Sequence, residues 1–129
     1  MSVLGDGDGI TVGIDIGTTS VKAVAADAEG RILARARVPH SVGVPRPGCF
    51  EHDADRAWRR GVLDALAQVA AAGEVAAVAV SAMVPSLAAL GPDGSALGPG
   101  LLYGDHRGAH PQSDPAAAGD QGELLAFLA

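Results

Sequence analysis

The chain has 129 residues, the usual size of one domain with a single core. Hydrophobic residues make up 48% and charged residues 19%, which excludes an intrinsically disordered chain. Nine basic against fifteen acidic residues give a net charge of −6, and the aromatics are two Phe, one Trp and one Tyr. Nucleic acid is therefore disfavoured as a partner, because it needs positive charge and stacking surfaces. The single cysteine, Cys49, excludes an intramolecular disulfide.

The sequence contains no recognisable targeting or membrane segment. Residues 1–9 include Asp6 and Asp8 and lack the basic and apolar regions of a signal peptide, so we expect a flexible N-terminus there. The longest apolar runs are shorter than the roughly 18 residues that indicate a membrane span. We expect a cytoplasmic protein without a membrane partner.

Three strands are expected at the start of the chain. Ile10–Ile16 alternates apolar residues with Thr, Gly and Asp, which is the pattern of a strand. A polar turn at residues 17–20 leads to a Val-rich second strand at residues 21–26. In the third, residues 31–38, arginines alternate with apolar residues, as on an edge strand that faces water. The pattern predicts an antiparallel hairpin extended by a third strand.

A helix and a further strand follow the Pro-rich loop at residues 39–48. Asp53 is a plausible N-cap for a helix running to about Ala72, and Gly73 is a suitable stop. Its expected apolar face consists of Trp58, Val62, Ala65, Leu66 and Val69. Residues 75–81 are almost wholly apolar and predict a strand that is buried on both faces in a parallel pairing.

The last elements are short. Residues 87–90 predict a strand that pairs with residues 100–103, because residues 91–94, Gly-Pro-Asp-Gly, form a strong turn signal. Residues 122–129 have the pattern of the first turns of a helix.

A group of residues suited to a nucleotide phosphate tail lies across the first expected hairpin. The strand presents a carboxylate, the turn offers backbone N–H groups and three hydroxyls, and a lysine follows. N–H groups and hydroxyls donate to phosphate oxygens, glycine permits close approach, and a carboxylate can hold hydrated Mg²⁺. The alternative is an ordinary hairpin, although its turn would favour Asn-Gly or Asp-Gly. The candidate phosphate-binding residues are Asp15, Gly17, Thr18, Thr19, Ser20 and Lys22, and the candidate metal ligand is Asp15.

Four segments carry a family resemblance. Residues 13–22, G-x-D-x-G-T-T-S-x-K, resemble the first phosphate motif of the actin-like ATPase superfamily. Residues 50–58 resemble the W-x-E-Q-D-P-x-x-W stretch of the FGGY carbohydrate kinases, with Glu51 and Asp53 in matching places and Trp58 one residue beyond the place of the second Trp. Residues 81–83 resemble the G-Q-M-H-G segment of xylulose kinases and S-A-M-H-S of gluconate kinases, and residues 101–107 resemble I-L-W-x-D-x-R. Their order is more specific than any one motif.

The resemblance implies an α/β fold of the ribonuclease H-like, actin-like type, with three antiparallel strands, a crossover helix and a fourth strand parallel to the first. It implies a kinase that transfers the γ-phosphoryl of MgATP to a sugar or polyol hydroxyl. The turn would hold the γ-phosphate end, and Asp15 would organise Mg²⁺. Residues 10–129 would be an incomplete N-terminal domain, with the catalytic Asp and the adenosine-binding lobe beyond Ala129. We therefore expect this chain alone to be inactive; a homodimer of a full-length form stays open.

The family pattern also implies part of a sugar site. Met83 and Val84 would line the pocket, and Tyr103 and Asp105 would contact the sugar or shape its floor, with Arg107 bracing that loop. From the residues alone, Met83 could instead fill a core and Asp105 form a turn. Val84 stands where xylulose kinases have His, and Tyr103 stands where the family has Trp, so the sugar is not identified.

Three other interpretations stay open. An actin-like ATPase of the chaperone or filament type would share the 13–22 hairpin, although residues 51–58 and 103–107 argue against it. A ribonuclease H-like nuclease would use Asp15 as a metal ligand, which the polar tip and the net charge of −6 disfavour. The chain could also be a non-catalytic remnant.

His106 and His110 have no third ligand nearby and predict surface histidines rather than a metal site.

Overall fold

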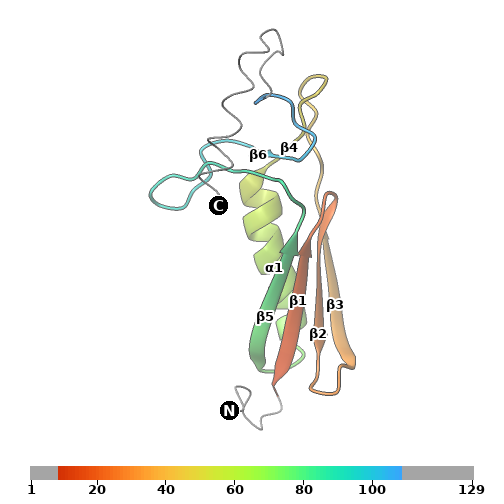
Figure 1. Cartoon of the computed structure of the whole chain (residues 1–129). Helices are drawn as coiled ribbons and strands as arrows, with labels where there is room; N and C mark the ends of the chain where they lie inside the picture. The colour runs from red at the N-terminus through yellow and green to blue at the C-terminus, as the bar shows by residue number, and fades with distance from the viewer. Residues whose placement is uncertain (1–8, 109–129) are drawn as a thin grey trace, which may run out of the picture.

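The computed structural model of the chain describes residues 9–108. Four strands form one sheet in the order β3-β2-β1-β5, and a second sheet of two short strands, β4 and β6, lies beyond its upper end (Figure 1). The strands are β1 (Ile10–Ile16), β2 (Ser20–Ala26), β3 (Ile32–Pro39), β4 (Glu51–His52), β5 (Val75–Ala82) and β6 (Gly100–Leu101). The expectations for residues 1–8 and for the helix at residues 122–129 lie outside the described residues.

The large sheet has the mixed topology that the sequence predicts. Strand β1 pairs with β2 antiparallel, β2 pairs with β3 antiparallel, and β1 pairs with β5 parallel. The strand bounds differ from the expected ones by about one residue. In this register Asp15 lies opposite Lys22 on β2 and beside Ser81 on β5. The parallel pairing requires a crossover, which the helical segment between β4 and β5 provides.

The core lies between one face of the sheet and the helix α1 (Gly61–Ala70) (Figure 1). Successive strand residues point to opposite faces, so every second residue of β1 and β2 faces the helix. The buried residues of this layer are Ile10, Val12, Ile14, Val21, Ala23, Ala25, Ala65 and Val69. Alternate residues of β3 pack against them, while Arg35 and Arg37 lie on the opposite face, as the arginine alternation predicts.

The helical segment begins with a wider turn than expected. Residues Asp55–Arg60 form a π-helix, η1, before α1, and the Gly61 N–H donates to the carbonyl of Arg56 five residues earlier. Asp53 acts at the start as predicted, since its Oδ1 accepts the Arg56 N–H at 2.9 Å. The expected apolar face is confirmed for Val62, Ala65, Leu66 and Val69, which lie in or against the core. Its fifth member, Trp58, packs instead against His52 and Gly100 of the small sheet.

The expected end of the helix, about Ala72, is two residues too late. Helix α1 ends at Ala70, and Gly73 lies in the turn that follows it. The absence of a side chain at Gly73 serves packing, because a Cβ there would lie 3.0 Å from Cγ2 of Ile10. Within residues 9–108, no helix has the length and apolar character needed to cross a membrane.

The predicted burial of β5 on both faces is wrong for the described part of the chain. Its residues from Ala76 onward are exposed, with Val78 at 47% and Val80 at 58%. The reason is positional: β5 is the edge strand, and α1 packs against β1, β2 and β3. The parallel pairing of β5 with β1 is nevertheless as predicted.

The expected strand at residues 87–90 is replaced by isolated bridges. Leu87 bridges Leu101, and Leu90 bridges Ala96 across the predicted Gly-Pro-Asp-Gly turn. Strand β6 pairs mainly with β4, with Gly100 opposite His52. The predicted antiparallel pairing of residues 87–90 with residues 100–103 is therefore present at Leu87 and Leu101, but it does not extend into a continuous strand.

We predict that Gly100→Ala destabilises the protein, because a Cβ at Gly100 would overlap the six-membered ring of Trp58. Overpacking of this kind costs about 1–3 kcal/mol of unfolding free energy. Gly98→Ala is the matched control, since its Cβ would meet nothing within 4 Å. Urea unfolding of both variants measures the difference, and equal stability would contradict the packing of Trp58 against β6.

Candidate functional site

The tip of the β1–β2 hairpin holds the predicted phosphate-binding residues. The Gly17 N–H donates to the Ser20 carbonyl at 3.0 Å and closes the turn. A Cβ at Gly17 would lie 3.2 Å from that carbonyl oxygen, so close approach of the backbone accounts for the glycine. Of the three hydroxyl residues, Thr19 is exposed, Thr18 is half-buried and Ser20 is buried at 1% exposure.

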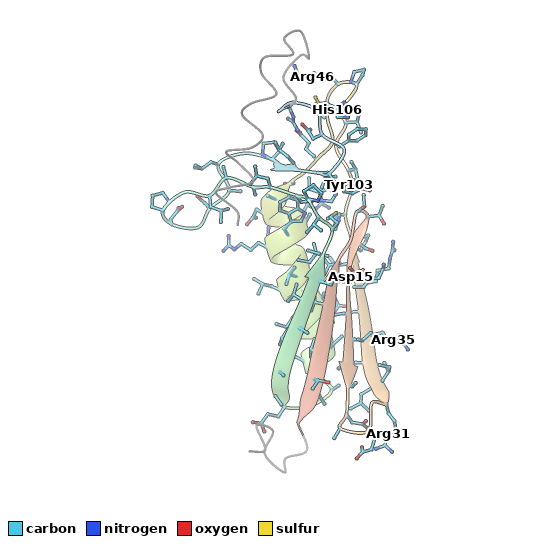
Figure 2. All side chains as sticks on the ribbon, viewed as in Figure 1. Asp15, Arg31, Arg35, Arg46, Tyr103 and His106 are labelled. Atoms are coloured by element: carbon cyan, nitrogen blue, oxygen red, sulfur yellow. The ribbon has the colours of Figure 1, made fainter. Side chains whose placement is uncertain are left out.

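Asp15 and Lys22 form an ion pair beside this turn. Lys22 Nζ lies 3.4 Å from Asp15 Oδ2, and both side chains are more than half exposed, at 59% and 51%. Figure 2 shows Asp15 near the end of β1 that leads into the turn. The carboxylate therefore remains accessible to a ligand in solution.

Two histidine rings form hydrogen bonds with carbonyl groups of the turn. Nε2 of His40 lies 2.9 Å from the carbonyl oxygen of Gly17, and Nε2 of His52 lies 2.9 Å from that of Thr18. The backbone N–H of His40 also donates to the carbonyl of Thr19 at 3.0 Å. The rings of the two histidines are 4.6 Å apart in an edge-to-face arrangement.

The protonation state of His52 follows from its partners. The indole N–H of Trp58 donates to Nδ1 of His52 at 2.9 Å, so Nδ1 carries no proton. A carbonyl oxygen can only accept, so Nε2 carries the proton that it donates to Thr18. Burial lowers the pKa of the imidazole below its ordinary value of 6.5, the hydrogen bond to Thr18 opposes this, and the proximity of the His40 ring adds to the lowering. His52 is therefore a neutral ring with a single tautomer.

The predicted sugar segment adjoins the phosphate turn. The backbone N–H of Met83 donates to the Ile16 carbonyl at 3.2 Å, which continues the β1–β5 ladder by one residue. The Thr18 hydroxyl lies 3.7 Å from the Met83 sulfur. Val84 follows with 80% exposure. Met83 thus touches the turn directly, and Val84 faces solvent.

Asp105 is enclosed by protein donors. Its side chain is 3% exposed; Oδ2 accepts the Phe50 N–H at 2.8 Å, and Oδ1 accepts the Arg107 N–H at 2.8 Å. The Arg107 guanidinium bonds both Asp105, at 2.7 Å, and Glu51, at 2.7 Å. The hydrogen bonds from Arg107 hold the pKa of the Asp105 carboxyl well below its usual range, against the effect of burial.

The predicted site residues thus form several separate contacts. Thr18 and Met83 touch, Asp15 and Lys22 pair, and Asp105 braces the loop around Phe50. Tyr103 is 59% exposed and lies beyond the same end of the large sheet as Asp15 (Figure 2).

Sequence reasoning gave no role to His40 or His52, which hold the turn. The only available signal was the position of His52 inside the Glu51–Asp53 motif. Nothing in the sequence pointed to His40, because its role depends on the pairing of β2 with β3.

The described residues contain no group of three or more His, Cys, Asp or Glu side chains arranged around a common point. A protein-only metal cage is therefore not formed within residues 9–108. A single accessible carboxylate suits Mg²⁺ that keeps several waters and is shared with substrate phosphates, which is the usual mode for this ion. Asp15 fits that role.

Comparison with known proteins gives the class first. The solved xylulose kinase from Rhodospirillum rubrum superposes with a TM-score of 0.70 at 26% identity, covering 93% of this chain and 25% of that structure. This likeness confirms the α/β fold of the ribonuclease H-like, actin-like type. The profile described as "FGGY family of carbohydrate kinases, N-terminal domain" matches residues 10–119.

The chain belongs to the FGGY family of carbohydrate kinases. It is 35% identical over 102 residues to xylulose kinase of Streptomyces rubiginosus, covering 78% of this chain and 21% of that protein. It is 39% identical over 70 residues to glycerol kinase of Nocardia farcinica, covering 54% of this chain and 14% of that protein. The chain thus spans about a fifth or less of these relatives. The comparisons do not favour the chaperone or filament interpretation.

We predict that Arg107→Ala lowers the urea midpoint clearly more than Arg31→Ala does. Removal of Arg107 leaves the enclosed Asp105 carboxylate without its cation, and an unpaired buried charge is costly. Arg31 is the control, because its side chain is 72% exposed and surface ion pairs contribute little. Equal shifts in the two variants would contradict a structural role for the Asp105–Arg107–Glu51 network.

We predict that the unfolding free energy falls as the pH is lowered from about 7 to about 5, because His52 takes up a proton more readily in the unfolded chain than in the fold. The pKa of His52 is lowered in the fold, so below its ordinary value of 6.5 the unfolded chain binds the extra proton. Asp27, Asp93 and Asp105 have lowered pKa values, so their contributions are lost only below the ordinary 3.8. Urea unfolding at several pH values tests this, and His52→Gln must flatten the upper part of the profile. An unchanged slope in that variant would show that another group titrates.

Proposed function

We propose that this chain contributes the phosphate-binding turn and part of the sugar site of an ATP-dependent sugar or polyol kinase. One observation carries the proposal: the Thr18 hydroxyl touches the Met83 sulfur. A kinase must bring the γ-phosphoryl group of ATP to a substrate hydroxyl, so its phosphate and sugar sites must adjoin. Residues 17–20 and the segment at Met83 are adjacent in this way, although they are more than sixty residues apart in sequence.

The turn supplies hydrogen-bond donors, and Asp15 supplies charge. Backbone N–H groups of the turn and the exposed Thr19 hydroxyl would donate to phosphate oxygens. Lys22 would neutralise part of the phosphate charge from its place beside Asp15. Asp15 would hold hydrated Mg²⁺, which supplies charge stabilisation to the transferring phosphoryl group when bound.

The sugar site divides into an exposed and an enclosed part. Tyr103 presents a half-exposed ring, which suits contact with the apolar face of a sugar. Asp105 would shape the floor of the site, because its oxygens already accept bonds from Phe50 and Arg107. Met83 and Val84 would line the wall next to the turn. The substrate class is a small sugar or polyol; xylulose and glycerol are the substrates named for relatives of this chain.

We propose neither Asp105 nor Asp15 as the base that accepts the proton of the attacking hydroxyl. Asp105 is a poor base because Arg107 holds its pKa low, and Asp15 is assigned to Mg²⁺. We expect the base, and the contacts to adenosine, from polypeptide outside the part of the enzyme that this chain spans. The chain alone would then bind phosphate without turnover; sugar-dependent release of ADP by the chain would contradict this assignment.

We predict that Asp15→Asn weakens binding of magnesium tripolyphosphate to the chain at least about tenfold, since a charge-assisted contact through Mg²⁺ is lost. Asp64→Asn is the matched control, because it removes the same charge from an exposed position on α1. Isothermal titration calorimetry with and without Mg²⁺ measures both. Equal affinities of the Asp15→Asn variant and the wild-type chain would refute the role of Asp15.

A further inference from the structure

The hairpin tip is held through its carbonyl groups. The carbonyls of Gly17, Thr18 and Thr19 accept hydrogen bonds from the His40 ring, the His52 ring and the His40 backbone N–H, at 2.9, 2.9 and 3.0 Å. The Ser20 carbonyl accepts the Gly17 N–H. Four successive carbonyls of one short turn are therefore all paired with protein donors, two of them with imidazole rings.

This pairing determines where the N–H groups of the turn point. A trans peptide is planar, with its C=O and the next residue's N–H directed oppositely, and among residues 9–108 the only cis peptide is Val84–Pro85. Holding the Gly17 and Thr18 carbonyls toward the histidines therefore directs the N–H groups of Thr18 and Thr19 away from them. Within the described part of the chain, neither N–H has a hydrogen-bond acceptor.

The two rings are themselves held in place. His52 is 1% exposed, and Trp58 fixes its tautomer by donating to Nδ1. The rings of His52 and Trp58 pack edge to face at 5.9 Å, and His40 packs against His52 at 4.6 Å. Trp58 comes from η1, His52 from β4, and His40 directly follows β3, so three elements converge on one turn. An ordinary hairpin turn needs no such support from outside.

We propose that His40 and His52 are positioning residues that orient the peptide planes of residues 17–19 so that the N–H groups of Thr18 and Thr19 face the phosphate. Neither histidine touches the ligand. This inference rests on the proposed phosphate-binding function and assigns to it two residues outside the binding motif. Preorganised donors need no rearrangement when the anion arrives, so loss of the histidine contact weakens binding without removing any group that touches phosphate.

The test compares substitutions that keep or remove the donor to the Thr18 carbonyl. His52→Gln retains an N–H donor near the position of Nε2, while His52→Leu has none. We expect His52→Leu to weaken binding of magnesium tripolyphosphate at least about tenfold, and His52→Gln to stay within about threefold of wild type. His106→Leu is the control, because it removes an exposed histidine from another loop. Calorimetry gives the affinities.

A second measurement uses the wild-type chain and therefore does not require that any variant folds. The ¹⁵N chemical shifts of the His52 ring in the wild-type chain report its tautomer, and we expect the proton on Nε2. Titration with magnesium tripolyphosphate must shift the amide signals of Thr18 and Thr19 more than those of strand residues remote from the tip. A proton on Nδ1, or undisturbed Thr18 and Thr19 amides during binding, would overturn the inference.

Failure of the proposed function is distinguishable from failure of this inference. A wild-type chain that binds no tripolyphosphate refutes the phosphate site, and the positioning role with it. Binding by the wild-type chain that His52→Leu leaves intact refutes the positioning role alone. An equal loss in His52→Leu and His52→Gln does the same, because it shows that the imidazole acts through packing and not through its bond to Thr18.

Discussion

The imidazole of His52 is the contact on which the arrangement of the upper end of the molecule depends. One nitrogen donates to the hairpin tip and the other accepts from the helical segment, while the residue itself belongs to the small sheet. An imidazole has two hydrogen-bonding atoms, and both are used. Gly100 of β6 pairs with His52 and lies against Trp58. A displacement of this ring would therefore move the turn, the helix start and the small sheet relative to one another.

The large sheet lies below that contact and carries the candidate site at its end (Figure 1). Helix α1 packs on the sheet across a layer that includes the small buried residues Ala23, Ala25 and Ala65. It covers β1, β2 and β3 and leaves the valines of β5 exposed among the described residues. The carboxyl ends of β1 and β5, which are parallel, both point toward the small sheet. For this reason Asp15, the turn and Met83 reach one place from two distant parts of the sequence.

Local patterns in the sequence predict most of the strands, their parallel or antiparallel pairing and the helix. Alternation in Ile10–Ile16 identifies the face that carries Asp15, and the polar tip predicts the candidate phosphate turn. Local sequence patterns do not show features that depend on contacts between distant elements. The prediction that β5 is buried on both faces was wrong, because an apolar run cannot show whether another layer covers it. The reduction of the expected strand at residues 87–90 to isolated bridges was not predicted, because it depends on where β6 pairs. The histidine support of the turn arises from three elements, so no single segment displays it.

The enclosed state of Asp105 limits how the proposed sugar site could work. A carboxylate that already accepts bonds from Phe50 and Arg107 would have to give up a charge-assisted bond to receive a sugar hydroxyl. In the proposed site, selectivity would then come from other groups, and Tyr103, which is 59% exposed, is one that a ligand can reach. Since Met83 contacts Thr18, a substrate that displaced the thioether would also act on the turn at residues 17–20. In the proposed kinase the phosphate and sugar sites would therefore meet at a polarizable sulfur, which adapts to the shape of its neighbours more readily than a branched side chain would.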